Sequence, residues 1–301
     1  MRITSRMMVD NLRQNIYNNT ESLASLQQQL ASGKRLSKPS DDPQGVSLAL
    51  TLRTTSAQYN QYLRNISSAT DWLQATDSAL DQISTVLTRA RDVALQGATG
   101  TLDRASQEAL GQEIDGYLHE AMQAVNSTQD GKYLLAGLQV GPGTAPFTED
   151  SSGTSIVYNG DASVMEREIA PGVKLGINVC GDVSVGGDEV LTNGLQALLD
   201  MRNQLLNVGA VTAGQIDKLT TALNDVPSLR SVVGTNTQRL SDTQDALNSL
   251  QTNVTAELSQ VQDADVAQVM TKLMMQESVY QAALNVGARV IQPSLLDFLT
   301  H

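Results

Sequence analysis

The residues that could carry out catalysis or bind a metal are few and scattered in this chain of 301 residues. Its two histidines, His119 and His301, are far apart, and Cys180 is its single cysteine. A zinc or iron site needs several such ligands together, and a disulfide within the chain needs a second cysteine. A serine, His119 and an aspartate make a triad on paper, but no glycine-framed nucleophile accompanies them. We predict no enzyme, no catalytic residues, no cofactor and no metal, with a cation held by carboxylates alone as the open alternative.

One adjacent pair of carboxylates, Asp41 and Asp42, could serve as general acid and base or as cation ligands. The pair follows Ser40 and precedes Pro43, and a polar cap followed by proline at the first helical position is a strong helix start. No other catalytic residue type lies nearby in the sequence, so we interpret the pair as helix caps. The stretch 181–187 lacks the lysine and the spacing of a phosphate-binding loop, and we interpret it as turns.

The helix that begins at Pro43 is predicted to run to about Gln96, without a further proline or an interior glycine after Gly45. Its apolar residues recur every seven positions, which keeps one face turned toward a partner helix over many turns. The main row is Leu52, Tyr59, Ile66, Leu73, Leu80, Leu87 and Ala94, and a second row is Tyr62, Ala69, Thr76, Ile83 and Ala90. Such a helix would be roughly 80 Å long and needs equally long partners to cover it.

The remaining helices are predicted from the same kind of pattern. They are expected at residues 10–31, 103–127, 191–206 and 216–223, followed by a last long helical region that begins after Pro227. The heptad of that region changes phase near Ala264, and Pro293 is expected to end it. In the first helix the residues of the apolar face are spaced alternately by four and three positions, and Asn19 takes one of these positions. A polar residue there can fix the register of a helix pair.

Between the two helical parts, residues 138–189 are rich in Gly, Thr, Ser and Val. Val173, Leu175, Ile177 and Val179 alternate with other residues, the period of a half-buried strand. Asn159-Gly160 predicts a hairpin turn between 155–158 and 163–169, and Pro171-Gly172 predicts the next turn. We expect a small antiparallel β insertion.

The predicted fold class is therefore mainly α, a long antiparallel coiled-coil-like helical rod formed by N- and C-terminal arms with a small antiparallel β insertion domain. The predicted domains are a terminal helical pair (1–42 and 264–301), a rod (43–137 and 190–263) and the insertion (138–189). Because the seam of the terminal pair is thin, we expect this pair to be loosely ordered in the monomer and to become ordered when copies pack together.

Charge is unevenly distributed along the chain. The net charge is −12, yet residues 1–40 hold six basic and two acidic residues, so the remainder carries −16. This argues against a nucleic-acid partner and is compatible with contact between copies. Charged residues make up only 17%, and the neutral polar faces suit either burial against other subunits or an ordinary solvated surface. No apolar stretch approaches a signal peptide or a membrane span, so we expect no membrane insertion, and either a cytosolic protein or export without a cleaved leader.

Several segments resemble the bacterial flagellin family. They are Leu30 to Leu36, Asp41 to Gly45, Leu87 to Gln96, and Asp263 to Gln292 with Leu295-Leu296 after it. Within the family, the opening residues 1–8, the closure 133–137 and the ending 293–299 are most similar to members at the hook–filament junction. The resemblance implies a structural subunit that is exported through the flagellar type III channel to the extracellular flagellum. It implies as partners other copies of the chain, hook-associated protein 1, flagellin and a cytosolic export chaperone.

We predict an assembly interface on the terminal helices. Its residues are Leu12, Ile16, Leu23, Leu26, Leu30, Val266, Leu273, Tyr280, Leu284, Leu295 and Leu296. The alternative interpretation is that these side chains form only the core between the chain's own helices. Two other functions stay open: a minor flagellin that builds the filament itself, and a type III secreted coiled-coil effector or translocator.

Overall fold

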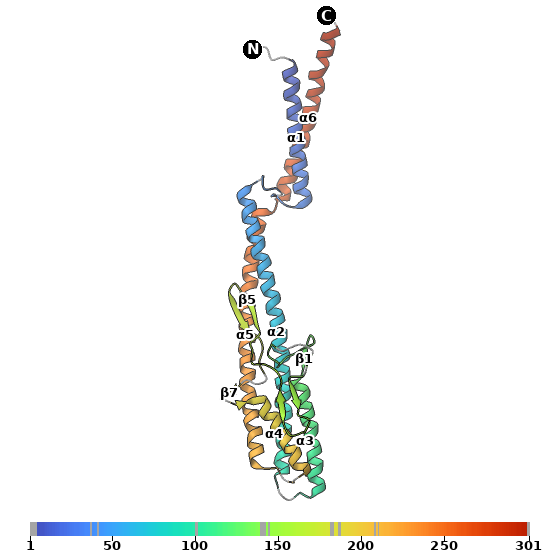
Figure 1. The fold of residues 1–301 in the computed structure, drawn as a ribbon. Helices are drawn as coiled ribbons and strands as arrows, with labels where there is room; N and C mark the ends of the chain where they lie inside the picture. Colours follow the sequence, from blue (N-terminus) through green and yellow to red (C-terminus); the bar gives the residue numbers. More distant parts are fainter. Residues whose placement is uncertain are drawn as a thin grey trace. The chain divides into compact units, whose positions relative to one another are not determined.

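The computed structural model describes residues 5–299 except 37, 41, 100–101, 139–142, 144, 181–183, 186–187, 208 and 210. The helices formed by these residues are α1 (Ser5–Ser32), α2 (Pro43–Gly97), α3 (Arg104–Val125), α4 (Val190–Asn207), α5 (Ala213–Gln262) and α6 (Val266–Leu299). The predicted fold class is confirmed as mainly helical, with N- and C-terminal helical arms and a small antiparallel β region (Figure 1). None of the helices in this described part is long and apolar enough to cross a membrane.

The chain forms two compact units, and α2 and α5 contribute to both of them. The terminal unit consists of residues 1–58 and 250–301, and the central unit consists of residues 59–249. Two compact units do not test the division into three domains that the sequence suggests, so that division stays a prediction.

The beginning of α2 and its heptad follow the sequence pattern closely. Asp42 accepts a hydrogen bond on its Oδ1 from the backbone N–H of Gly45 at 3.0 Å, so it caps the helix as expected. Asp41 lies outside the described residues. The fully buried members of the predicted rows in the central unit are Ile66, Ala69, Leu73, Thr76, Leu80, Ile83, Leu87, Ala90 and Ala94. A repeat of seven thus marks the covered face of α2 between Ile66 and Ala94.

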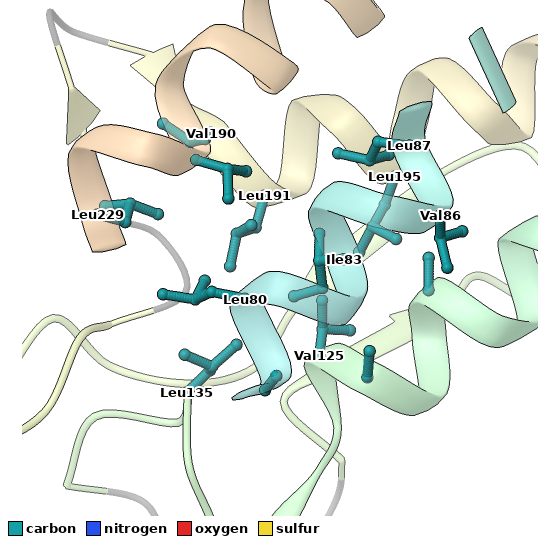
Figure 2. Packing of buried hydrophobic residues seen from close by; sticks show 14 of the residues in the cluster. Leu80, Ile83, Val86, Leu87, Val125, Leu135, Val190, Leu191, Leu195 and Leu229 are labelled. Carbon is teal, nitrogen blue, oxygen red and sulfur yellow. The ribbon is translucent and has the colours of Figure 1, made fainter. Parts of the chain in front are cut away.

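The core of the central unit lies where α2, α3, α4 and α5 pack against one another. Figure 2 shows Leu80 and Ile83 of α2 close to Val125 of α3 and Leu191 of α4. Leu135, which lies ten residues after the end of α3, packs into the same cluster. Trp72, the single tryptophan, belongs to the same apolar cluster. Burial of this apolar surface is the main stabilising contribution to the unit.

Two prolines that the sequence pattern treats as helix boundaries lie inside helices instead. The helix α5 continues through Pro227, so the predicted break there is wrong. Proline removes a backbone hydrogen bond, but burial of its neighbours Val226 and Leu229 offsets that loss. The predicted end at Pro293 is also wrong, because α6 runs on to Leu299. The side chains around Pro293 are outside the described part of the chain.

The β region consists of short two-stranded antiparallel ladders. Its pairs are β1 (Thr128–Gln129) with β2 (Lys132–Tyr133), β3 (Phe147–Glu149) with β4 (Ile156–Tyr158), β5 (Glu166–Ala170) with β6 (Val173–Gly176), and β7 (Ser184–Val185) with β8 (Asp188–Glu189). The predicted turn at Pro171-Gly172 joins β5 and β6 and is confirmed, with Gly172 at φ 72°.

The predicted hairpin across Asn159-Gly160 is wrong, because β4 pairs backward with β3. Phe147 lies opposite Tyr158 in this ladder, with ring centroids 5.0 Å apart. The side chain of Asn126, at the end of α3, accepts from the N–H of Phe147 and donates to its carbonyl, each at 2.9 Å. An aromatic pair with a buried phenylalanine and an anchor on α3 therefore outweigh the local turn preference of Asn-Gly.

Candidate assembly surface

In the terminal unit, α1 and α6 lie side by side and antiparallel (Figure 1). Leu12 lies next to Gly287, Asn19 is hydrogen-bonded to Gln276, and Lys34 forms a β-bridge with Asp263. These contacts show that the two helices run in opposite directions. The two ends of the sequence therefore belong to one unit, although more than 200 residues separate the helices in sequence.

The seam between these helices is regular but thin. On α1 it consists of the half-buried Leu12, Ile16, Asn19, Leu23, Leu26 and Leu30. On α6 it consists of Val269, Leu273, Gln276, Tyr280, Ala283 and Gly287. Both rows have alternating spacings of four and three, the pattern of a coiled-coil seam. Only Val269 and Gly287 are buried, so a pair of helices alone leaves most of the seam partly open to water.

Gly287 allows a close approach between the two helices. A Cβ atom at this position would lie 2.9 Å from Cδ2 of Leu12, closer than side chains normally pack. A residue with a side chain would therefore push Leu12 away. This contact places the leucine of α1 directly on the backbone of α6.

Beyond the helix pair, the connector after α1 is tied to the segment between α5 and α6. Gly33 adopts φ 67°, the left-handed conformation expected of a helix cap, and its carbonyl accepts from the N–H of Ala264 at 2.9 Å. The N–H of Arg35 donates to the carbonyl of Gln262 at 2.7 Å. The Gln262 side chain is only 4% exposed and accepts from Nε of Arg53 at 3.1 Å. The connector after α1 and the segment between α5 and α6 are thus held together by hydrogen bonds.

The structure distributes the predicted interface residues over different environments. Leu12, Ile16, Leu23, Leu26, Leu30, Leu273 and Tyr280 lie in the seam. Val266 is 52% exposed and Leu284 is 44% exposed, so neither packs into it. Leu284 follows Ala283 by one residue, and one residue turns an α-helix by about 100°. The side chains of Leu295 and Leu296 lie outside the described part of the chain. Whether these residues contact other copies stays a prediction.

Large apolar side chains on α6 remain uncovered on both sides of the seam. Val266, Met270 and Met274 are spaced by four and therefore share one flank, while Met275 and Val279 lie on the other. Val286 extends the second flank by a further seven residues and is 55% exposed. Large exposed apolar patches of this kind mark contact sites, because water disfavours them. These methionines are not among the predicted interface residues, although the spacing of four between Met270 and Met274 is readable in the sequence.

His119 and Cys180 belong to the central unit and not to the terminal unit. His119 is exposed on α3 and its Nδ1 is 2.8 Å from the carbonyl of Asp115 in the same helix. Cys180 is buried, and burial raises the pKa of its thiol, which lowers its reactivity. In the described part of the chain, no three His, Cys, Asp or Glu side chains gather closely enough to hold a metal.

The known proteins that are similar to this chain are flagellar proteins. Residues 3–140 match the bacterial flagellin N-terminal helical region, and residues 216–299 match the bacterial flagellin C-terminal helical region. The chain is 26% identical to flagellar hook-associated protein 3 of Escherichia coli, over 94% of this chain and 95% of that protein. It is 24% identical to the flagellin of Listeria monocytogenes over the full length of both.

Solved structures share the fold. A putative flagellar hook-associated protein from Vibrio parahaemolyticus has a TM-score of 0.66 at 22% identity, covering 74% of this chain and 100% of that one. FlgL of Xanthomonas campestris has a TM-score of 0.56 at 14% identity, covering 69% of this chain and 99% of that one.

Proposed function

The chain belongs to the flagellin family, and from this premise we propose that it is a structural subunit at the hook–filament junction of the bacterial flagellum. The flagellin family consists of structural proteins and not of enzymes. The observation that carries the proposal is the similarity to hook-associated protein 3 along nearly the whole length of both chains.

The terminal unit supplies the physical basis for polymerisation. Its helix pair has a half-buried seam and, on α6, uncovered apolar side chains on both flanks. Packing of neighbouring copies against these flanks would remove the apolar surface from water and stabilise the pair. The predicted interface residues that lie in the seam would then be ordered together with those on the flanks, such as Val266 and Leu284.

The proposal includes partners and a location. The subunit contacts other copies of itself, hook-associated protein 1 on the hook side and flagellin on the filament side. It is exported through the flagellar type III channel and acts outside the cell. Before export, a cytosolic chaperone shields the apolar surface of α6, which exposes three methionines, Met270, Met274 and Met275.

A minor flagellin is the second candidate, favoured by the full-length similarity to the Listeria monocytogenes flagellin. The two functions differ in how far the protein polymerises. Purified flagellin should grow long filaments on a filament seed, whereas a junction subunit should add only a short zone. Growth of long filaments, seen by electron microscopy, would favour the second candidate.

The proposal predicts the effect of deleting the gene. Cells without the protein should carry hooks without filaments and should release flagellin into the medium. Electron microscopy of the cell surface and detection of flagellin in the supernatant measure both effects. Filaments of normal length on the deletion strain would contradict the proposal.

A finer test changes the seam. Leu26→Asp or Leu273→Asp places a charge among half-buried apolar side chains, and we expect loss of filament attachment without unfolding of the central unit. Matched controls are Ser25→Asp and Ser278→Asp, which put the same charge on exposed positions of the same helices. Complementation of the deletion strain, scored by swimming, should fail for the seam variants and succeed for the controls. Normal swimming by both seam variants would contradict the role of the seam.

A further inference from the structure

The seam between α1 and α6 contains one polar side chain with an amide on each helix, and these two side chains meet. Nε2 of Gln276 donates to Oδ1 of Asn19 at 3.1 Å, and both side chains are half-buried. The other seam residues are apolar or small: Leu12, Ile16, Leu23, Leu26 and Leu30 on α1, and Val269, Leu273, Tyr280, Ala283 and Gly287 on α6.

Apolar side chains alone specify the register of this pair weakly. Because the seam repeats every seven residues, sliding α6 by one heptad, about 10 Å, again places apolar rows against each other. In such a slid pair Asn19 would come opposite Val269 or Ala283, and Gln276 opposite Leu12 or Leu26. Each amide would then lack its partner on the other helix, and a half-buried polar group without a partner destabilises the pair.

We propose that Asn19 and Gln276 form a polar lock that fixes the register of α1 against α6. The lock selects the one alignment in which both amides are paired. The register in turn fixes the axial position of the uncovered apolar rows of α6 relative to α1. The inference rests on the helix pair alone and holds whichever flagellar role the chain has.

Disulfide trapping in the full chain tests the lock. All variants carry Cys180→Ser, so that the introduced cysteines are the only thiols. Leu12→Cys with Gly287→Cys reports the observed register, because Cγ of Leu12 lies 3.7 Å from a Cβ built at Gly287. Leu12→Cys with Tyr280→Cys reports a slide of one heptad. Each pair is made with the native amides and with Asn19→Leu plus Gln276→Leu, then oxidised mildly and quantified by mass spectrometry of the linked peptides.

With the native amides, we expect the 12–287 linkage to exceed the 12–280 linkage by a factor of roughly 5 to 30, the population effect expected when both half-buried amides lose their partner. With both leucines, this excess should fall by a factor of at least about 5, while the backbone hydrogen bonds of Gly33 to Ala264 and of Arg35 to Gln262 still favour the observed register. The control replaces Gln14 and Asn18, an exposed amide pair on α1 with a 3.1 Å hydrogen bond, by leucine and should keep the native ratio.

Three results would overturn the lock. The first is an unchanged ratio in the Asn19→Leu, Gln276→Leu variant. The second is equal linkage of both reporters with the native amides, which would mean that the pair has no fixed register. The third is a loss of the ratio in the Gln14→Leu, Asn18→Leu control, which would assign the effect to added apolar surface.

Discussion

At the scale of single residues, Arg202 of α4 shows how a charged side chain links three parts of the central unit. Its guanidinium forms ion pairs with Asp115 of α3 at 3.2 Å and with Glu149 of β3 at 2.7 Å, and its side chain is only 12% exposed. Burial lowers the pKa of Arg202, but the hydrogen bonds and charges of Glu149 and Asp115 outweigh burial and raise it. No periodicity marks this residue in the sequence, because its partners are distant along the chain.

Removal of this side chain should therefore weaken the central unit. We expect Arg202→Ala to lower the free energy of unfolding by about 2 to 3 kcal/mol, since two carboxylates lose a largely buried partner. Urea unfolding followed by the fluorescence of Trp72, which lies in the core of this unit, measures the change.

The matched control for Arg202 is Lys174→Ala. Lys174 pairs with Glu166 at 3.1 Å, but both side chains are more than half exposed. Exposed ion pairs contribute little, so this change should stay within about 0.5 kcal/mol. Equal effects of the two substitutions would contradict the importance of burial at Arg202.

At the scale of elements, close packing of helices depends on where glycine lies within them. Gly111 of α3 faces α4, and a Cβ atom there would lie 3.2 Å from Cβ of Leu205 and 2.9 Å from Cδ2 of Leu206. Gly116, five residues further along α3, has no atom within 4 Å of such a Cβ. The same residue type therefore has a packing role at one position and none at the other.

This difference predicts opposite consequences for two identical substitutions. Gly116→Ala should raise the free energy of unfolding by about 0.5 to 1 kcal/mol, because alanine loses less backbone entropy in a helix. Gly111→Ala gains the same propensity but forces α4 away, so it should be at least about 1 kcal/mol less stable than Gly116→Ala. Urea unfolding followed by Trp72 fluorescence compares them, and equal stabilities would refute the close-packing role of Gly111.

Elements also differ in how far the sequence reveals them. The bounds of α2 follow from the cap at Asp42 and the heptad, both of which neighbouring residues encode. Pro227 in α5 and the pairing of β4 with β3 were predicted wrongly. In both cases contacts with distant segments outweigh a local preference, and such contacts have no signature in the adjoining residues.

At the scale of the whole molecule, the two units differ in how well their helices are covered. The central unit buries a large apolar cluster drawn from four helices, whereas the terminal pair leaves nearly all of its seam half-buried. Local opening is easier where few apolar side chains are buried. Order in the terminal pair should therefore depend on additional contacts that neighbouring copies supply.

Hydrogen exchange of the free chain measures this contrast. Amides of residues 10–30 and 269–287 should exchange at least about tenfold faster than those of residues 66–94, because opening of the terminal pair exposes less apolar surface. The same terminal amides should become protected in the assembled flagellum. Equal protection of both sets in the free chain would contradict the dependence on assembly.

The sequence by itself determined the helical class, the seam rows of α1 and α2, the cap at Asp42 and the membership in the flagellin family. These features are encoded locally, in caps, periods and short motifs, and therefore survive without knowledge of what packs where. Only the tertiary structure decided that Gln276 is the partner of Asn19, that Pro227 is tolerated within α5, and that apolar side chains of α6 stay uncovered. Each of these depends on which distant segments meet, and that is set by the packing free energy of the folded chain.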